Sequence, residues 1–230
     1  MNLLNLLNQP SDAEIQHQIH FQMLIILKSF TAMLAGDGGL ESVGELTAAL
    51  VETPASDRAA KSLKSDPESS ALIQERYIAP PHNLDMLLQC PPDSLGRIYA
   101  TRMKTQGFDP DLYSHMKIDS DASYVEARLS QTHDIWHIVT GFDVSPVGEI
   151  GLQAFHLPQF PYPLAAMLIA NALVSSTLLA PNELPKLIQA IAQGLEMGRI
   201  AKSLFAQRWE EGWDKPLSEW QAELNIRPIC

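Results

Sequence analysis

The chain has 230 residues, of which 46% are hydrophobic and 19% are charged, and its formal net charge is -11. This length and composition are sufficient for one domain with its own hydrophobic core. The negative charge excludes the basic surface that a nucleic-acid-binding protein needs, and it disfavours electrostatic attraction to an anionic membrane.

The first 120 residues predict helices that are separated by glycine- and proline-rich turns. A long helix is expected over 13–35 and a second over 40–51, whereas the polar stretch 53–70 has no clear assignment. Pro92-Asp93 opens another helix that runs to residues 106–107. His17 and His20 could form a metal pair, but a solvated helical face is the simpler interpretation.

Two adjacent helices carry the strongest chemical signal. The first is expected to begin near Ser120-Asp121 and to end at Gly141, which is suited to a left-handed helix end. Ser145-Pro146 is typical of a cap followed by a proline in the first turn of the next helix. Because the connection is so short, the two helices should be antiparallel neighbours.

Four polar residues of this helix pair form a candidate metal site. His133 and His137 are four residues apart and share one helical face, and Asp134 lies in the same sector. Glu149 lies about one turn after the loop and should face His137. Two histidines and two carboxylates suit zinc, iron(II), manganese or, less well, magnesium. The same spacing is also compatible with a buried polar network without metal.

An uncharged stretch from Leu157 to Asn182 follows these helices. It contains an apolar helix over 164–180, which is slightly short for a bilayer span and has prolines at both ends, so a buried core helix is favoured. It could instead form an apolar wall for a lipid tail. Another helix is expected from Asn182 or Glu183 to about Phe205. The tryptophans of the C-terminal segment are expected to be packing anchors, namely Trp209, Trp213 and Trp220.

The chain as a whole predicts one all-α domain over residues 1–230, with a metal-binding helix hairpin and an apolar lipid-binding cleft. No alternating strand pattern and no phosphate-binding glycine loop occurs in the sequence. The pattern HDxxH followed by eleven residues and Glu149 resembles the metal signature of the coenzyme Q (ubiquinone) biosynthesis protein Four family. Two further segments are similar to that family, SLGRIYATRMKTQGFDPD from Ser94 and GRIAKSLFAQRWEEGWDKPLSEWQAEL from Gly198. The family-like region covers about residues 93–224.

The resemblance implies a role in quinone biosynthesis. It implies that His133, Asp134, His137 and Glu149 bind a divalent metal, for which zinc is the first expectation, and that the chain binds a polyprenyl lipid or prenylated quinone precursor. The implied activity is a metal-dependent decarboxylase (lyase) that acts oxidatively on a polyprenyl-hydroxybenzoate. The alternative is a non-catalytic scaffold that binds prenyl lipid, other quinone-biosynthesis enzymes and the membrane periphery. A homodimer is a further expectation, and a metallohydrolase like the HExxH peptidases is a remote alternative.

The sequence also predicts a location. No Lys or Arg precedes Lys28, and neither a secretion signal nor an import segment is recognisable. Cys90 and Cys230 have no metal-binding spacing and are expected to be reduced. We therefore expect a cytoplasmic, bacterial protein that is peripherally associated with a membrane.

Overall fold

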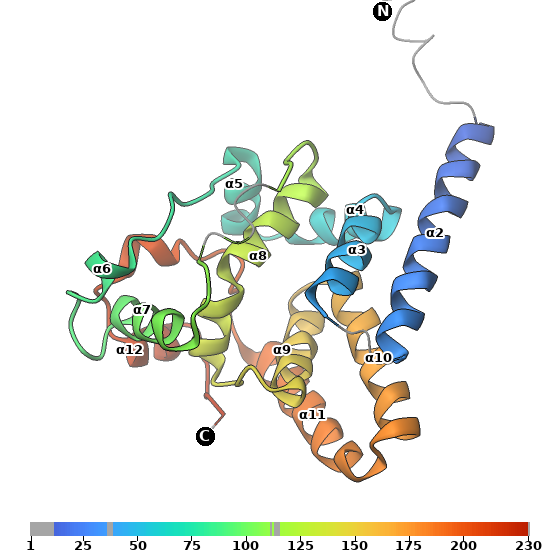
Figure 1. The fold of residues 1–230 in the computed structure, drawn as a ribbon. Coiled ribbons are helices and arrows are strands. Elements are labelled where there is room, and N and C mark those ends of the chain that lie inside the picture. Colours follow the sequence, from blue (N-terminus) through green and yellow to red (C-terminus); the bar gives the residue numbers. More distant parts are fainter. Residues whose placement is uncertain (1–11, 36–38, 111, 113–115, 230) are drawn as a thin grey trace, which may run out of the picture.

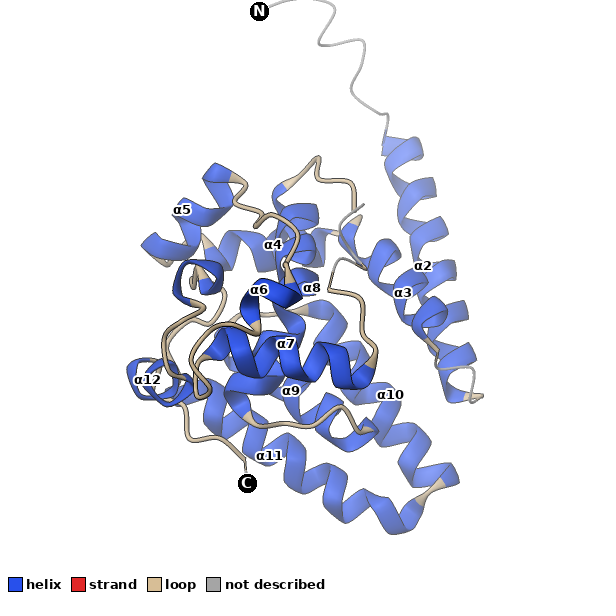
Figure 2. Cartoon of the chain, turned by 60° about the vertical axis from the view of Figure 1, so that its left-hand side comes forward, coloured by secondary structure: helices blue, strands red, loops and turns tan. Residues whose placement is uncertain are grey.

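A computed structural model describes residues 12–35, 39–110, 112 and 116–229, with side chains from residue 21 onward except that of residue 40. The described part is all-α, as predicted, and contains no strand (Figure 2). Its helices are α2 (Asp12–Leu34), α3 (Leu40–Val51), α4 (Pro54–Leu63), α5 (Pro67–Glu75), α6 (Leu84–Leu87), α7 (Leu95–Gln106), α8 (Asp121–Thr140), α9 (Pro146–Gln159), α10 (Pro163–Leu179), α11 (Leu184–Ile200) and α12 (Leu217–Glu223), with short 3₁₀ helices η1 (Pro181–Glu183) and η2 (Trp209–Gly212).

Helix α8 runs through the middle of the molecule (Figure 1). On one side lie α2, α3, α9, α10 and α11, and on the other lie α5, α6, α7 and α12. Helix α8 contacts members of both groups, and its own buried face contributes large side chains such as Tyr124 and Trp136 to the main core. Residues on α8 are therefore held from several directions. The side chains of His17 and His20 lie outside the described ones.

The ends of α8 and the start of α9 follow the predicted capping residues. The Ser120 hydroxyl accepts a hydrogen bond of 3.0 Å from the Ser123 backbone N–H at the start of α8. Gly141 ends α8 with φ of 81°, and a Cβ there would lie 2.5 Å from the Ile229 carbonyl oxygen. Ser145 caps α9 by accepting a bond of 3.1 Å from Gly148. Local chemistry thus sets the hairpin that carries the candidate metal ligands.

Three other expectations need correction or refinement. The unassigned stretch 53–70 forms α4 and the start of α5, and both helices begin with a proline in the first turn. Helix α10 is buried only in its N-terminal half, because Leu178 and Leu179 near its end are 72% and 69% exposed. Helix α11 ends at Ile200 rather than near Phe205. None of the described helices is both long and apolar enough to cross a bilayer.

Helix α9 packs much more extensively against α11 than against α8. Glycines in α11 allow this close approach. A Cβ at Gly194 would lie 2.1 Å from the Gly151 carbonyl oxygen and 2.9 Å from the Phe155 nitrogen. The small residue therefore permits backbone-to-backbone contact between α9, which carries Glu149, and the helix that supports it.

Replacing Gly194 by alanine is expected to lower the free energy of unfolding by about 1–3 kcal/mol, because the added methyl group meets backbone atoms that cannot move independently. Urea denaturation measures the change. Gly44→Ala in α3 is the matched control, since nothing lies within 4 Å of its added Cβ. That substitution should be neutral or stabilising by up to about 1 kcal/mol. Equal effects of the two substitutions would contradict the packing argument.

The C-terminal segment completes the core with its aromatic residues, as predicted. Trp209 is fully buried, Trp220 is nearly so, and their ring centroids lie 4.8 Å apart. Trp213 is partly buried and stacks on Tyr99 of α7 with ring centroids 5.2 Å apart. These tryptophans therefore pack the segment after α11 against the rest of the fold and stabilise its position.

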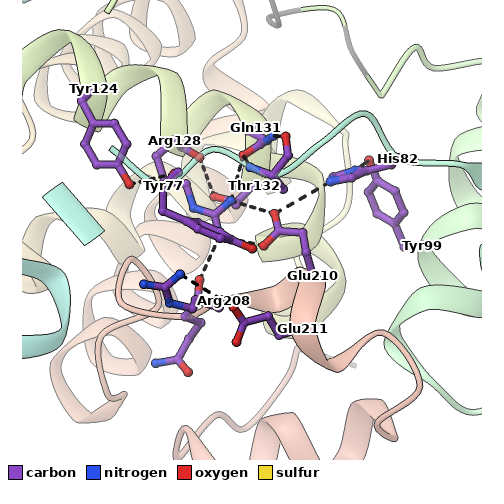
Figure 3. Close-up of polar contacts among 12 residues, drawn as sticks. Tyr77, His82, Tyr99, Tyr124, Arg128, Gln131, Thr132, Arg208, Glu210 and Glu211 are labelled. Carbon is purple, nitrogen blue, oxygen red and sulfur yellow. Dashed lines mark hydrogen bonds and ion pairs between the residues drawn. The ribbon is translucent and has the colours of Figure 1, made fainter. Parts of the chain in front are cut away.

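A buried ion pair joins α8 to η2 (Figure 3). Arg128 donates bidentate hydrogen bonds of 2.7 and 3.0 Å to the Glu210 carboxylate, and the two side chains are 1% and 7% exposed. Arg128 also donates to the Gln131 side chain at 2.8 Å and to the Gln207 carbonyl at 2.9 Å. Burial alone would raise the pKa of Glu210, but neighbouring His82 and Arg128 lower it to about 2. The Glu210 carboxylate is therefore ionised, and the two terminal nitrogens of Arg128 make four hydrogen bonds while its buried Nε atom has no partner.

Candidate metal centre

His133 and His137 on α8 and Glu149 on α9 form a compact cluster. The His137 Nε2 lies 3.1 Å from the His133 Nε2 and 3.1 Å from Glu149 Oε1. The His133 Nε2 lies 3.3 Å from Glu149 Oε2. His137 is fully buried, whereas the His133 and Glu149 side chains are 33% and 36% exposed. The structure thus brings these three side chains together where α8 and α9 meet, and His133 and Glu149 are partly open to solvent.

A backbone contact orients His137. Its Nδ1 lies 2.9 Å from the carbonyl oxygen of Phe142, in the loop between α8 and α9. Because a carbonyl oxygen can only accept, Nδ1 carries the hydrogen, and in the neutral ring the lone pair is left on Nε2. This is the usual arrangement of a metal-binding histidine, whose other nitrogen donates to a carbonyl or carboxylate. Sequence reasoning did not find this backbone group.

The charges of the cluster favour an ionised carboxylate. Burial alone would raise the pKa of Glu149, but hydrogen bonds and positive charge from His133 and His137 hold that pKa well below its usual range. Burial alone lowers the pKa of His133. Hydrogen bonding and charge from Glu149, with the charges of Asp134 and Glu126, outweigh burial and raise that pKa. The site therefore contains one ionised carboxylate beside the Nε2 atoms of two imidazoles.

The donor set fits a divalent cation. Four ligands at about 2.0 Å from a tetrahedral ion are separated from one another by about 3.3 Å. The three separations in the cluster are 3.1, 3.1 and 3.3 Å. Two imidazoles and one carboxylate are ligands that zinc and iron(II) accept. Three such ligands leave at least one coordination position for water or a substrate.

Asp134 does not belong to this group. Among the described residues, the three that offer ligand atoms within 4.8 Å of one another are His133, His137 and Glu149. Asp134 is half-buried beside His133, about 100° away around the helix, and its charge contributes to the raised pKa of His133. Its role as a fourth ligand stays a prediction.

Other polar residues that sequence reasoning missed extend from the cluster. Glu126 and Tyr162 are 7% and 6% exposed, and the Tyr162 hydroxyl donates to the two Glu126 carboxylate oxygens at 2.9 and 2.8 Å. Gln153 and His156 on α9 are 7% and 3% exposed. The spacing of seven residues between Glu126 and His133 could have revealed the first of them, since such residues share a helical face. Tyr162 carries no comparable signal.

The buried acid makes stability depend on pH. Burial raises the pKa of Glu126 to about 7 from its ordinary 4.5, although the hydrogen bond from Tyr162 and the charge of His133 lower it. The folded state therefore binds the proton more tightly than the unfolded state. The stability from this group is fully present below about pH 4.5 and is lost as the pH rises toward 7.

Glu126→Gln should remove this dependence. Relative to the variant, the wild-type protein should lose about 2–3 kcal/mol of unfolding free energy between pH 5 and pH 8. Urea denaturation at several pH values measures the difference. Glu196→Gln, which changes an exposed carboxylate paired with Arg199, should give a nearly constant difference. A constant difference for Glu126→Gln as well would contradict the assigned burial.

Two surface pockets lie away from the metal cluster. A pocket of about 640 Å³ is lined mainly by polar and charged residues of α5 and the C-terminal segment, and one of about 370 Å³ lies between α2 and α3. Neither includes His133, His137 or Glu149. The predicted apolar lipid-binding cleft therefore stays a prediction.

Comparison with known proteins gives a consistent set of relatives. Residues 14–229 match the family model described as coenzyme Q (ubiquinone) biosynthesis protein Coq4, a wider span than the region 93–224 noted from motifs. The mitochondrial ubiquinone biosynthesis protein COQ4 of Uncinocarpus reesii is 26% identical, and the match covers 96% of this chain and 81% of that protein. The mitochondrial COQ4 homologue of Rattus norvegicus is 29% identical, and the match covers 72% of this chain and 63% of that protein.

A solved structure is also similar. The crystal structure of a candidate ubiquinone biosynthesis protein from Nostoc punctiforme PCC 73102 superposes with a TM-score of 0.80 at 35% identity. The match covers 87% of this chain and 96% of that one. The all-helical fold is thus shared with a protein whose structure was determined by experiment.

The predicted location is wrong. A cytoplasmic, bacterial, peripherally membrane-associated protein was expected, whereas the curated relatives from Uncinocarpus reesii and Rattus norvegicus are named as mitochondrial. The expectation depended on the absence of Lys and Arg before Lys28. Local absence of charge does not identify a compartment, and the names of the relatives overturn the inference.

Proposed function

Since this chain belongs to the coenzyme Q (ubiquinone) biosynthesis protein Coq4 family, whose role is ubiquinone biosynthesis, we propose that it is a metal-dependent enzyme of that pathway. The proposed substrate is a polyprenyl-hydroxybenzoate. In the proposed reaction the bond from the ring to the carboxylate breaks, carbon dioxide leaves, water supplies a hydroxyl group in its place, and dioxygen takes up the two electrons and becomes hydrogen peroxide. The observation that carries this proposal is the triangle of ligand atoms from His133, His137 and Glu149.

Each residue of the cluster would have a separate role in the reaction. His133, His137 and Glu149 would hold a divalent cation, which when bound stabilises negative charge on a substrate oxygen. The Phe142 carbonyl keeps His137 in the tautomer that offers Nε2. Partial exposure of His133 and Glu149 lets a substrate carboxylate reach the site from solvent.

A polyprenyl tail needs an apolar surface. Helices α10 and α11 both contact α9, and both expose large apolar side chains. These residues are Val174, Leu178 and Leu179 on α10 and Ile188 and Leu195 on α11. We propose that they bind the isoprenoid chain while the ring acid lies at the cluster, because exposed apolar area on neighbouring helices gains free energy when a lipid covers it.

The test uses a substrate labelled with ¹³C in its carboxylate. Purified protein loaded with zinc, iron(II) or manganese receives the prenylated acid with dioxygen as oxidant, and mass spectrometry measures labelled carbon dioxide. The wild-type protein with the correct metal should release the label, and Glu149→Gln should not. Absence of release with each of the three metals would overturn the enzymatic proposal.

A scaffold without catalysis is the second candidate. The observation in its favour is a row of exposed apolar residues along α2, namely Phe21, Leu24 and Leu27, which share one helical face. Such a row suits other quinone-biosynthesis enzymes or a second copy of the chain. Quinone synthesis in cells that survives Glu149→Gln but not Leu24→Glu would support the scaffold over the enzyme.

A further inference from the structure

The polar surface between α8 and α9 continues well past the metal cluster. Around α8, Glu126 projects at an angle about 20° from His133 and about 20° from His137. It lies two turns before His133, at a distance along the helix of about 10 Å. The small, half-buried Ser130 occupies the same face between them. Glu126 thus marks the far end of the face on which the two metal-binding histidines lie.

Helix α9 presents a matching polar face. Gln153 and His156 lie about 40° and 20° around the helix from Glu149. Glu149 contacts His133 and His137 at one end, and His156 stacks on Trp136 of α8 at the other, with ring centroids 4.6 Å apart. Gln153 lies between Glu149 and His156 on the same buried face of α9.

Gln153 and Glu126 are both buried, and both have hydrogen-bonding capacity that the described side chains do not use. The Gln153 Oε1 atom is buried and accepts no hydrogen bond. The Glu126 carboxylate is buried without a cation among its hydrogen-bond partners, and only the Tyr162 hydroxyl donates to it among the described side chains. Leaving such groups buried costs free energy unless a ligand uses them.

We propose that Glu126, Tyr162 and Gln153 form a second polar subsite of the metal centre, which binds the hydroxyl group of a hydroxyaryl acid whose carboxylate lies at the metal cluster. This inference rests on the proposed function. The hydroxyl group donates to the Glu126 carboxylate or to Gln153 Oε1, and Tyr162 holds Glu126 in place.

The dimensions agree with such a ligand. A metal–oxygen bond of about 2 Å, a benzene ring with para substituents and one hydrogen bond of about 2.7 Å together span about 10 Å. That is the length between His133 and Glu126 along α8. An aryl acid without the hydroxyl group would leave the subsite unsatisfied, so the subsite selects for the hydroxyl group.

The neighbours of the subsite support a neutral, apolar environment around the ring. Burial lowers the pKa of His156 to about 3, so this imidazole is uncharged near neutral pH. Trp136, which stacks on His156, and Phe155 line the same interface, with ring centroids 5.9 Å apart. An aromatic ring is suited to such surroundings, because stacked and edge contacts between rings are favourable.

The experiment compares two simple probes on the metal-loaded protein. Isothermal titration calorimetry measures the dissociation constants of 4-hydroxybenzoate and benzoate. The wild-type protein should bind 4-hydroxybenzoate at least about tenfold more tightly, as expected for one hydrogen bond to a buried carboxylate. Tyr162→Phe and Glu126→Leu should remove this preference and leave the benzoate affinity and metal content unchanged.

Tyr124→Phe is the matched control. This buried tyrosine on α8 donates to the Tyr77 carbonyl, away from the subsite, so its removal should keep the tenfold preference. If Glu126→Leu does not fold, Tyr162→Phe alone decides. A metal-loaded wild-type protein that binds both probes equally would overturn the subsite and leave the proposed function standing. A protein that binds no divalent metal would overturn the proposed function, and with it the subsite.

Discussion

Arg128→Ala is expected to lower the free energy of unfolding by about 3–5 kcal/mol, because it leaves the Glu210 carboxylate buried without its cation. The loss should also release η2 from α8, since Arg128 bonds to both Glu210 and the Gln207 carbonyl. Urea denaturation followed by circular dichroism measures the change. Such a loss is a large fraction of the stability of an ordinary domain.

Two further sets of variants separate the effect of burying the ion pair from the effect of its charge on the free energy of unfolding. Arg199→Ala breaks an exposed pair with Glu196 and should change stability by less than about 1 kcal/mol. Combining Arg128→Met with Glu210→Leu should be less damaging than Arg128→Met alone, because no unpaired charge remains. An Arg128→Ala protein that is as stable as the Arg199→Ala control would show that the network does not stabilise α8.

His137→Ala should abolish stoichiometric metal binding. Its Nε2 atom is one corner of the ligand triangle and lies 3.1 Å from the His133 Nε2 and 3.1 Å from Glu149 Oε1. Loss of a direct ligand should reduce the metal affinity by more than the roughly 10–100-fold that loss of an outer hydrogen-bond partner costs. Competition with a chromophoric chelator measures the affinity, and circular dichroism checks the fold. Turnover of the labelled aryl acid should be lost together with the metal.

His82→Gln serves as the control for removal of a buried histidine. His82 lies near Glu210 and Tyr99 and is outside the metal cluster, so its substitution should leave the metal affinity unchanged. A His137→Ala protein that retains full affinity would mean that the histidine and glutamate residues form a metal-free polar network.

The hairpin that carries the site was predictable because its determinants are local. Ser120 marks the start of α8, Gly141 marks its end, and Ser145 marks the start of α9. The loop between the two helices is too short to separate His137 from Glu149. Helical periodicity then places His133 beside His137. These short-range effects therefore account for the proximity of His133, His137 and Glu149.

The remaining features depend on contacts between distant segments. Tyr162 reaches Glu126 over 36 residues, and no periodic pattern in the sequence connects them. Helix α11 stops at Ile200 because the Lys202 backbone N–H bonds to the Leu224 carbonyl, and the following Leu204 and Phe205 are buried outside a helix. Apolar residues continue past the helix end, so hydrophobicity alone predicted a longer helix.

The position of Asp134 relative to the cluster also depends on a contact between two helices, which the sequence alone does not give. Helical geometry places it in the sector of His133 but about 100° away, and the direction of the neighbouring helix decides which carboxylate completes the cluster. Glu149 approaches from α9 and completes the three-residue cluster, and the role of Asp134 as a further ligand stays a prediction. A sequence pattern can therefore identify candidate ligands, whereas the position of the neighbouring helix decides which of their side chains lie together.

A crystal structure of the metal-loaded protein, with the ion located by its anomalous diffraction, tests the central claim most directly. We expect one divalent ion per chain, about 2.0–2.2 Å from the Nε2 atoms of His133 and His137 and from a Glu149 carboxylate oxygen. An ion bound elsewhere, or no ion at these three residues when metal is supplied in excess, would contradict it.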